Sequence, residues 1–118
     1  MGLAVDDDDN LLIADAGNYR IRRVTPAASG VGFVINTVAG GGLLDGNVLA
    51  LNAALGPVHG LSVGNGGDIY LTDTYYCRIR RFRVGGQIVT IAGRPAATGG
   101  CESSLDGAAA TSRPLFYP

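Results

Sequence analysis

The sequence predicts an all-β fold built from two antiparallel, four-stranded units. The 118-residue chain repeats one phrase, DAGNYRIRRV at 15–24 and DTYYCRIRRF at 73–82. Nineteen glycines indicate many turns, and the apolar runs between them are short, as in LLIA and VGFVI. Hydrophobic residues make up 47% of the chain, which is enough for a modest core in one ordinary-sized domain.

The two copies align over most of their length. Segment 2–5 corresponds to 60–63, and the repeated phrase follows at the same offset, so that Asp15 corresponds to Asp73. TVAG at 37–40 corresponds to TIAG at 90–93, with five extra residues in the first copy near PAASG. LDG at 44–46 corresponds to LDG at 105–107, and Pro57 corresponds to Pro118. Three blocks in the same order predict tandem units at 1–59 and 60–118.

Each unit is expected to form four short strands separated by turn residues. The expected strands are 2–6, 10–15, 19–25 and 32–39 in the first unit, and 60–64, 68–73, 77–83 and 86–92 in the second. The connection from 41 to 59 begins with three glycines and contains ALNAAL, for which we expect a helical turn. A repeated four-stranded meander with a long return connection is typical of the blades of a β-propeller.

The pattern Gly-Leu-x-Val, then Asp-x-x-Asn-x-Arg-Ile, then Thr-Val-Ala-Gly, then Asp-Gly and Pro resembles the NHL repeat. The resemblance covers nearly the whole chain as two tandem copies. Asn18 belongs to the signature in the first copy, whereas the second copy has Tyr76 at that position and Cys77 in place of Tyr19. The resemblance implies a closed propeller of about six blades, which lies within the range of four to eight for small propellers in general.

Two blades cannot close a ring, and they would expose an apolar, strand-rich flank on each side. The chain is therefore expected to be a fragment of a longer protein or a unit that assembles with itself. The sequence starts at the first strand of one unit and stops where the next would start, which we take to favour self-assembly. Head-to-tail association of three copies would give a homotrimer with six blades.

Acid–arginine pairs flank the turn between the second and third strands of each unit. We expect Asp15 with Arg20, and Asp73 with Arg78, to be structural pairs, because Asp accepts turn amides and Arg bonds a carboxylate bidentately. The other arginines of the repeated phrases are expected on a solvated outer edge. A basic stripe for RNA phosphates or an acidic protein is the alternative for these residues, Arg22, Arg23, Arg80, Arg81 and Arg83.

The same turns supply the candidate binding surface, because they combine tyrosines with polar and basic side chains. The candidate residues are Asn18, Tyr19, Arg22, Tyr75, Tyr76 and Arg80. Exposed tyrosines beside arginines suit protein contacts or base stacking, and tyrosines packed within the turn are the alternative. We expect a non-enzymatic scaffold that binds itself and a protein ligand. An RNA-binding module is the second hypothesis, and a metal-dependent lyase or hydrolase is a remote third.

Metal and cofactor sites are not expected. DDDDN at 6–10 is expected to be a hairpin turn, with a calcium loop as the alternative. His59 is the single histidine, too few for zinc unless three chains bring three copies together. Cys77 and Cys101 allow one disulfide, although we expect two unpaired thiols.

Net charge and hydropathy give no support to a polyanionic partner or to a membrane helix. The nine basic residues are all arginines and ten acids offset them, so a net charge of −1 gives no overall attraction to nucleic acid or anionic membranes. No apolar run approaches the roughly 18 residues of a membrane helix. No basic start precedes an apolar stretch, so no signal peptide is expected, and the sequence does not define a compartment.

Overall fold

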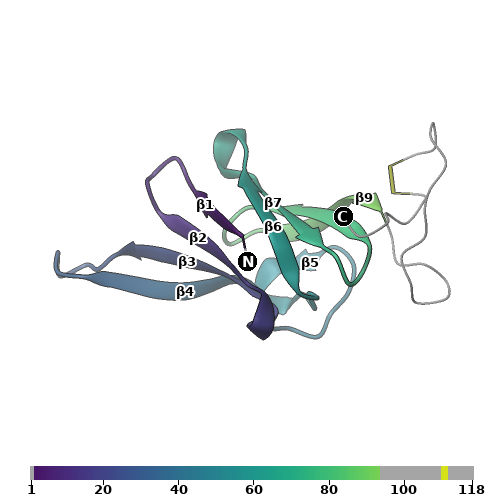
Figure 1. Ribbon diagram of the computed structural model, residues 1–118, viewed down its shortest axis with the longest axis horizontal. Coiled ribbons are helices and arrows are strands. Elements are labelled where there is room, and N and C mark those ends of the chain that lie inside the picture. The colour runs from purple at the N-terminus through teal and green to yellow at the C-terminus, as the bar shows by residue number, and fades with distance from the viewer. Residues whose placement is uncertain (1, 94–109, 112–118) are drawn as a thin grey trace.

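The computed structural model describes residues 2–93 and 110–111, and these residues form two antiparallel sheets (Figure 1). The first sheet contains β1 (Leu3–Val5), β2 (Leu11–Asp15), β3 (Arg20–Pro26) and β4 (Phe33–Gly40), in chain order. The second has the order β5-β9-β8-β7-β6, with β5 (Val48–Leu49), β6 (Val58–Val63), β7 (Ile69–Asp73), β8 (Arg78–Phe82) and β9 (Gln87–Gly93). The predicted all-β fold is confirmed.

The second sheet has five strands, and the prediction of four is wrong for it. The additional strand β5 comes from the connection after β4 and pairs with β9 through Val48 with Ile88 and Leu49 with Gln87. The outer edge of β9 offers unpaired backbone groups, and β5 satisfies some of them. The expected helical turn in ALNAAL is present as the 3₁₀ turn η2 (Ala50–Asn52). Strand β6 begins at Val58, two residues earlier than expected.

The two sheets share a register as well as a strand order. Asp15 lies opposite Arg20 in the first sheet, and Asp73 lies opposite Arg78 in the second. Each sheet has a register shift at the same place, between Ile21 and Arg22 and between Ile79 and Arg80. Such bulges twist the strand pair locally, and their recurrence shows that the repeat extends to backbone detail.

One hydrophobic core joins both sheets and the connection between them. It contains Leu12, Ala14 and Ile21 from the first sheet, Ala53 and Leu55 from the connection, and Ile69, Leu71, Phe82 and Ile88 from the second sheet. Strand β6 contacts β1 and β2, and the sheets fan outward from this junction (Figure 1). The described part of the chain contains no helix long and apolar enough to cross a membrane.

Candidate functional site

The turn after the second strand of each unit has the same backbone shape. In the first unit a 3₁₀ turn, η1 (Ala16–Asn18), leads to Tyr19 with φ of 55°. In the second unit the turn ends at Cys77 with φ of 56°. A left-handed conformation is uncommon for residues other than glycine, so its presence at equivalent positions marks a turn held by its surroundings. This turn places the acid before it and the arginine after it directly opposite each other.

In the second unit the expected pair of Asp73 and Arg78 is present and buried. Arg78 Nε donates to Asp73 Oδ2 at 2.9 Å, and the Gly56 amide donates to Asp73 Oδ1 at 3.1 Å. Arg78 Nη1 also donates to Asp45 Oδ1 at 2.7 Å. Burial raises the pKa of Asp73, and the charge of Arg78 opposes this effect. The Arg78 hydrogen bond lowers the pKa of Asp45, which lies on the connection after β4. Arg78 thus links the sheet to this connection.

Arg80 is fully buried, and the expectation that it lies on a solvated outer edge is wrong. Its side chain lies on the same face of β8 as Arg78 and donates from Nη2 to the Gly46 carbonyl. Burial, with the nearby charge of Arg78, lowers the pKa of Arg80 to about 10. Its Nε and Nη1 have no hydrogen-bond partner in the part of the chain described. The connection covers Arg80, which strand alternation alone does not reveal.

In the first unit, Asp15 has other hydrogen-bond partners than its equivalent Asp73. Asp15 accepts a hydrogen bond from Asn18 Nδ2 at 3.0 Å and lies 3.7 Å from Arg22 Nη1. Arg20 is exposed and forms no ion pair within residues 2–93, so the expected Asp15–Arg20 pair is not formed. The physical reason is that, among residues 2–93, no connection covers this face of the first sheet as 41–57 covers the second. The structure therefore brings Asp73 and Arg78 together but leaves Arg20 outside the equivalent arrangement.

The candidate tyrosines divide into exposed and packed side chains. Tyr75 is 68% exposed and Tyr19 is 52% exposed. Tyr76 lies under Arg78, whose guanidinium carbon is 4.8 Å from the ring centroid, and contacts Tyr75 edge-on at 5.0 Å between centroids. This geometry suits a cation–π contact, so Tyr76 supports the arginine from within the turn. Tyr19 and Tyr75 remain available on the surface.

An apolar surface on the connection was missed in the sequence. Leu43 is 93% exposed, and three further leucines are at least half exposed. This leucine surface consists of Leu43, Leu44, Leu49 and Leu51. Leu49 and Leu51 border a depression of ≈ 150 Å³ that also includes Val38. The signal in the sequence was the spacing LLxxxxLxL in a connection that needs few leucines for its own turns.

The acid run forms the hairpin turn that was expected between β1 and β2. Asp6 Oδ1 accepts the amides of Asp8 and Asn10 at 3.0 and 2.9 Å, and Asp6 Oδ2 accepts Asn10 Nδ2 at 3.1 Å. Burial acts to raise the pKa of Asp6, but the hydrogen bonds from Asn10 outweigh it, and the pKa is lowered. Across residues 2–93 and 110–111, no three His, Cys, Asp or Glu side chains form a group that could hold a metal ion.

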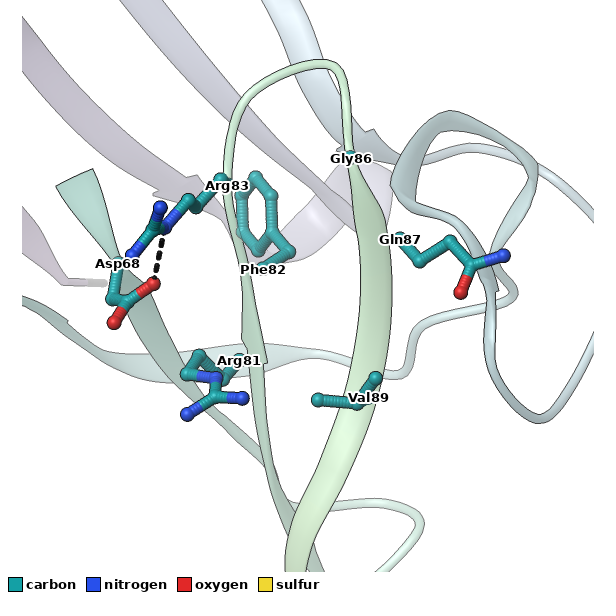
Figure 2. A pocket seen from close by; sticks show the side chains of 7 residues that line it. All are labelled: Asp68, Arg81, Phe82, Arg83, Gly86, Gln87 and Val89. Atoms are coloured by element: carbon teal, nitrogen blue, oxygen red, sulfur yellow. Dashed lines mark hydrogen bonds and ion pairs between the residues drawn. The ribbon is translucent and has the colours of Figure 1, made fainter. Parts of the chain in front are cut away.

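Arg81 and Arg83 lie toward the opposite end of the second sheet from Arg78. Figure 2 shows Arg83 bonded to Asp68 and Arg81 near this pair. The three residues border a depression of ≈ 320 Å³, and the Nε and Oδ1 atoms of the pair are 2.7 Å apart. The side-chain hydrogen bond between them, aided by opposite charge, lowers the pKa of Asp68 and raises that of Arg83. Arg81 and Arg83 are exposed, as expected, whereas Arg22 and Arg23 are half-buried. One of the two exposed charges is therefore already neutralised.

The two cysteines and the single histidine of the sequence remain. Cys77 is buried and disulfide-bonded, so the expectation of two unpaired thiols is wrong. Cys101, the chain's other cysteine, lies outside the described residues. His59 is exposed on β6.

Comparisons with known proteins support the fold. No protein-family model matches the chain, and no curated protein matches it. Among solved structures, the chain is similar to a structural genomics protein of unknown function from Bacteroides thetaiotaomicron, with a TM-score of 0.65 and 17% sequence identity. The match covers 94% of this chain and 26% of that chain, so this chain spans about a quarter of the solved protein.

Proposed function

We propose that the chain is a pair of NHL-like propeller blades that assembles head to tail into a closed ring and acts as a non-enzymatic, protein-binding scaffold. One observation carries this proposal. A set of residues buried on one face of the second sheet has equivalents, 58 positions earlier, on an uncovered face of the first sheet. We call the uncovered set the open face: Leu3, Val5, Leu11, Ile13, Asp15, Arg20, Arg22 and Val24.

The equivalent residues of the second sheet show what this face does when it is covered. They are Leu61, Val63, Ile69, Leu71, Asp73, Arg78, Arg80 and Phe82. Six of them are buried and the other two pack partly against the core, whereas Leu3 and Val5 are 61% and 59% exposed. Burial of apolar area drives association, so an uncovered copy of a buried face is a surface that needs a partner.

The second sheet has a complementary uncovered face. Its residues Tyr70, Thr72 and Ile79 are equivalent to Leu12, Ala14 and Ile21, which are fully buried against the second sheet. They border a depression of ≈ 250 Å³ on the side away from the first sheet. Each of the two ends of the molecule therefore carries one half of the contact that already joins the two sheets. Such a head-to-tail contact closes into a ring when the rotation per unit permits it.

The expected ring contains three chains, which supplies the six blades that the NHL resemblance implies. Light scattering or native mass spectrometry of the 118-residue chain should find three chain masses. Masses of two or four chains would mean rings of four or eight blades and would correct the number. A folded monomer at all concentrations would contradict self-assembly, and the two open faces would then belong to contacts with further blades of a longer polypeptide.

The leucine surface and the exposed tyrosines support a protein ligand rather than RNA. Leu43, Leu44, Tyr19 and Tyr75 are large, exposed and uncharged, which suits the core of a protein contact. RNA binding needs several free cations, but Arg78 and Arg80 are buried and Arg83 is paired with Asp68. Among the described arginines of the repeated phrases, this leaves Arg20 and Arg81 exposed without an ion pair, and they lie on different sheets. Retention on single-stranded RNA should therefore be weak and nearly independent of salt. Tight retention that falls steeply with salt would favour the RNA-binding module.

A further inference from the structure

The contact between the two sheets includes three polar bonds that come from the connection after β4. Asp45 accepts from Arg78 at 2.7 Å, the Gly46 carbonyl accepts from Arg80, and the Gly56 amide donates to Asp73 at 3.1 Å. The connection thus gives one hydrogen bond to each of Asp73, Arg78 and Arg80, by means of one carboxylate, one carbonyl and one amide. These three bonds also hold the connection over the face of the second sheet that carries Asp73, Arg78 and Arg80.

The first sheet has the same acid and the same two arginines, but among the described residues no connection bonds to them. Asp15, Arg20 and Arg22 are equivalent to Asp73, Arg78 and Arg80, and we call these three residues the polar socket. Arg20 is exposed, and Arg22 Nε is shielded from solvent yet has no hydrogen-bond partner in the described residues. The 3.7 Å separation of Arg22 and Asp15 is longer than a hydrogen bond, so the donors of Arg22 remain available.

The chain carries a second copy of the segment that fills this kind of socket. Leu44, Asp45 and Gly46 recur as Leu105, Asp106 and Gly107. Pro57 lies eleven positions after Gly46, and Pro118 lies eleven positions after Gly107, so the position equivalent to Gly56 is Tyr117. The order and spacing of the three bonding groups are therefore the same in both segments.

We propose that segment 105–117 of a second copy of this chain binds the polar socket, with Asp106 bonded to Arg20, the Gly107 carbonyl to Arg22, and the Tyr117 amide to Asp15. The proposal rests on the head-to-tail assembly proposed above and names the residues that define its register. Local charge favours this pairing, because Asp106 is the one carboxylate of the segment and would face the two arginines of the socket. The one arginine of the segment, Arg113, is equivalent to Asn52, which forms none of the three bonds in the second sheet. Apolar contact alone would leave the two sheets free to slide, whereas three directed bonds fix one docking position.

A charge-reversal cycle tests the pairing of Arg20 with Asp106. Native mass spectrometry over a concentration series would compare the wild-type chain with Arg20→Asp, Asp106→Arg and the variant carrying both changes. Each single reversal should raise the midpoint concentration for assembly by about tenfold or more, as expected for a close charge pair in an interface. The combined variant should return the midpoint to within about threefold of the wild-type value, since the pair is restored with its charges exchanged.

Arg83→Asp is the matched control, because it makes the same charge change on an exposed arginine at the opposite end of the second sheet, and it should leave the midpoint unchanged. Circular dichroism of each variant separates misfolding from lost assembly, and restoration by the combined variant cannot arise from misfolding. If the wild-type chain assembles and neither single reversal moves the midpoint, the socket pairing is wrong and the assembly stands. The pairing is also wrong if the combined variant fails to recover. A wild-type chain that stays monomeric overturns both proposals.

Discussion

Two arginines of β8 show how neighbours decide the energetic role of a side chain. Arg78 and Arg80 lie on one face of the strand and both are buried. Arg78 is bonded to two carboxylates, and its Nη2 alone has no partner in the described chain. Arg80 is bonded to one carbonyl, and its Nε and Nη1 have no partner among the same residues. A buried charge that is paired contributes differently to the free energy of unfolding from one that is not, because only strong partners offset the cost of desolvation. The same residue type therefore has opposite expected effects on stability.

Replacement of each arginine by methionine should separate these effects. Arg78→Met leaves the buried Asp73 carboxylate without its ion pair, and the free energy of unfolding should fall by about 3–5 kcal/mol. Arg80→Met removes a poorly satisfied cation and keeps an unbranched apolar chain, so stability should change by less than about 1 kcal/mol or rise. Urea unfolding at one protein concentration measures both. Equal losses in the two variants would show that Arg80 is as fully satisfied as Arg78.

The carboxyl of Asp45 should make stability depend on pH in the acidic range. The Arg78 hydrogen bond, aided by the Gly46 amide, lowers the folded-state pKa of Asp45 below its ordinary value of 3.8. The stabilisation is therefore complete above that value and is lost as the pH falls through the folded-state pKa. Asp73 has a raised pKa and acts in the opposite direction, so it does not produce this loss.

Asp45→Asn is the variant that isolates this group, since its side-chain oxygen still accepts a bond but no longer titrates. Thermal unfolding between about pH 6 and pH 2 should show a smaller acid-induced loss in the variant than in the wild-type chain. Asp6 and Asp68 also have lowered pKa values, but they are present in both proteins and cancel in the comparison. Parallel pH curves would mean that the Asp45 contact contributes nothing in solution.

Single turns set the register of the strands that they join. In the β1–β2 hairpin, Asp6 accepts three hydrogen bonds while Asp9 takes a left-handed conformation with φ of 62°. An aspartate that bonds to the backbone two to four residues later closes such a turn in place of a backbone bond. The run of four aspartates therefore contains one residue that shapes the turn and others that are exposed on it.

Asp6→Ala should lower the free energy of unfolding by about 1–2 kcal/mol, because it removes the acceptor for the Asp8 and Asn10 amides. Asp7→Ala changes an exposed side chain of the same run and should alter stability by less than about 0.5 kcal/mol. Urea unfolding with and without calcium distinguishes the turn from a metal loop. A calcium-dependent stabilisation of the wild-type chain that Asp7→Ala abolishes would favour the metal loop instead.

A strand could be predicted where the residues that define it lie within its own segment of the sequence. The eight main strands were predictable because short apolar runs between glycine and aspartate turns repeat in both units. Strand β5 was not, because two residues carry no periodicity and pair only where the edge of β9 reaches them. The burial of Arg80 and the exposure of Arg20 were unpredictable for a related reason: both depend on the covering connection, which is remote in sequence.

At the scale of the whole molecule, two repeated sheets create one covered contact and two uncovered halves of the same contact. The covered contact buries Ile69 and Leu71 of β7 and Arg78 and Arg80 of β8, and it shields the ion pair of Arg78 with Asp73 from water. The uncovered halves expose equivalent residues at the two ends of the pair. The match to the solved structure covers 94% of this chain and 26% of that chain, and it supports the fold alone. The head-to-tail proposal requires further blades beyond these two. Whether copies or further chain provide them is the question that solution mass answers.

The open face should hold this assembly together through its apolar residues. Leu3 and Val5 point outward from β1, on the same face as Ile13 and Leu11, so their replacement by glutamate should leave the fold of one chain intact. The double variant should be monomeric under conditions in which the wild-type chain is expected to form the proposed trimer, because each subunit contact would bury two unpaired carboxylates. A matched control introduces glutamate at Val31 and Phe33, which are more exposed than Leu3 and Val5 and lie in the distant β3–β4 hairpin, and this variant should still form the expected trimer. Light scattering measures all three proteins. If the hairpin variant dissociates and the Leu3 and Val5 variant does not, the chains meet through the hairpin and the proposed ring geometry is wrong.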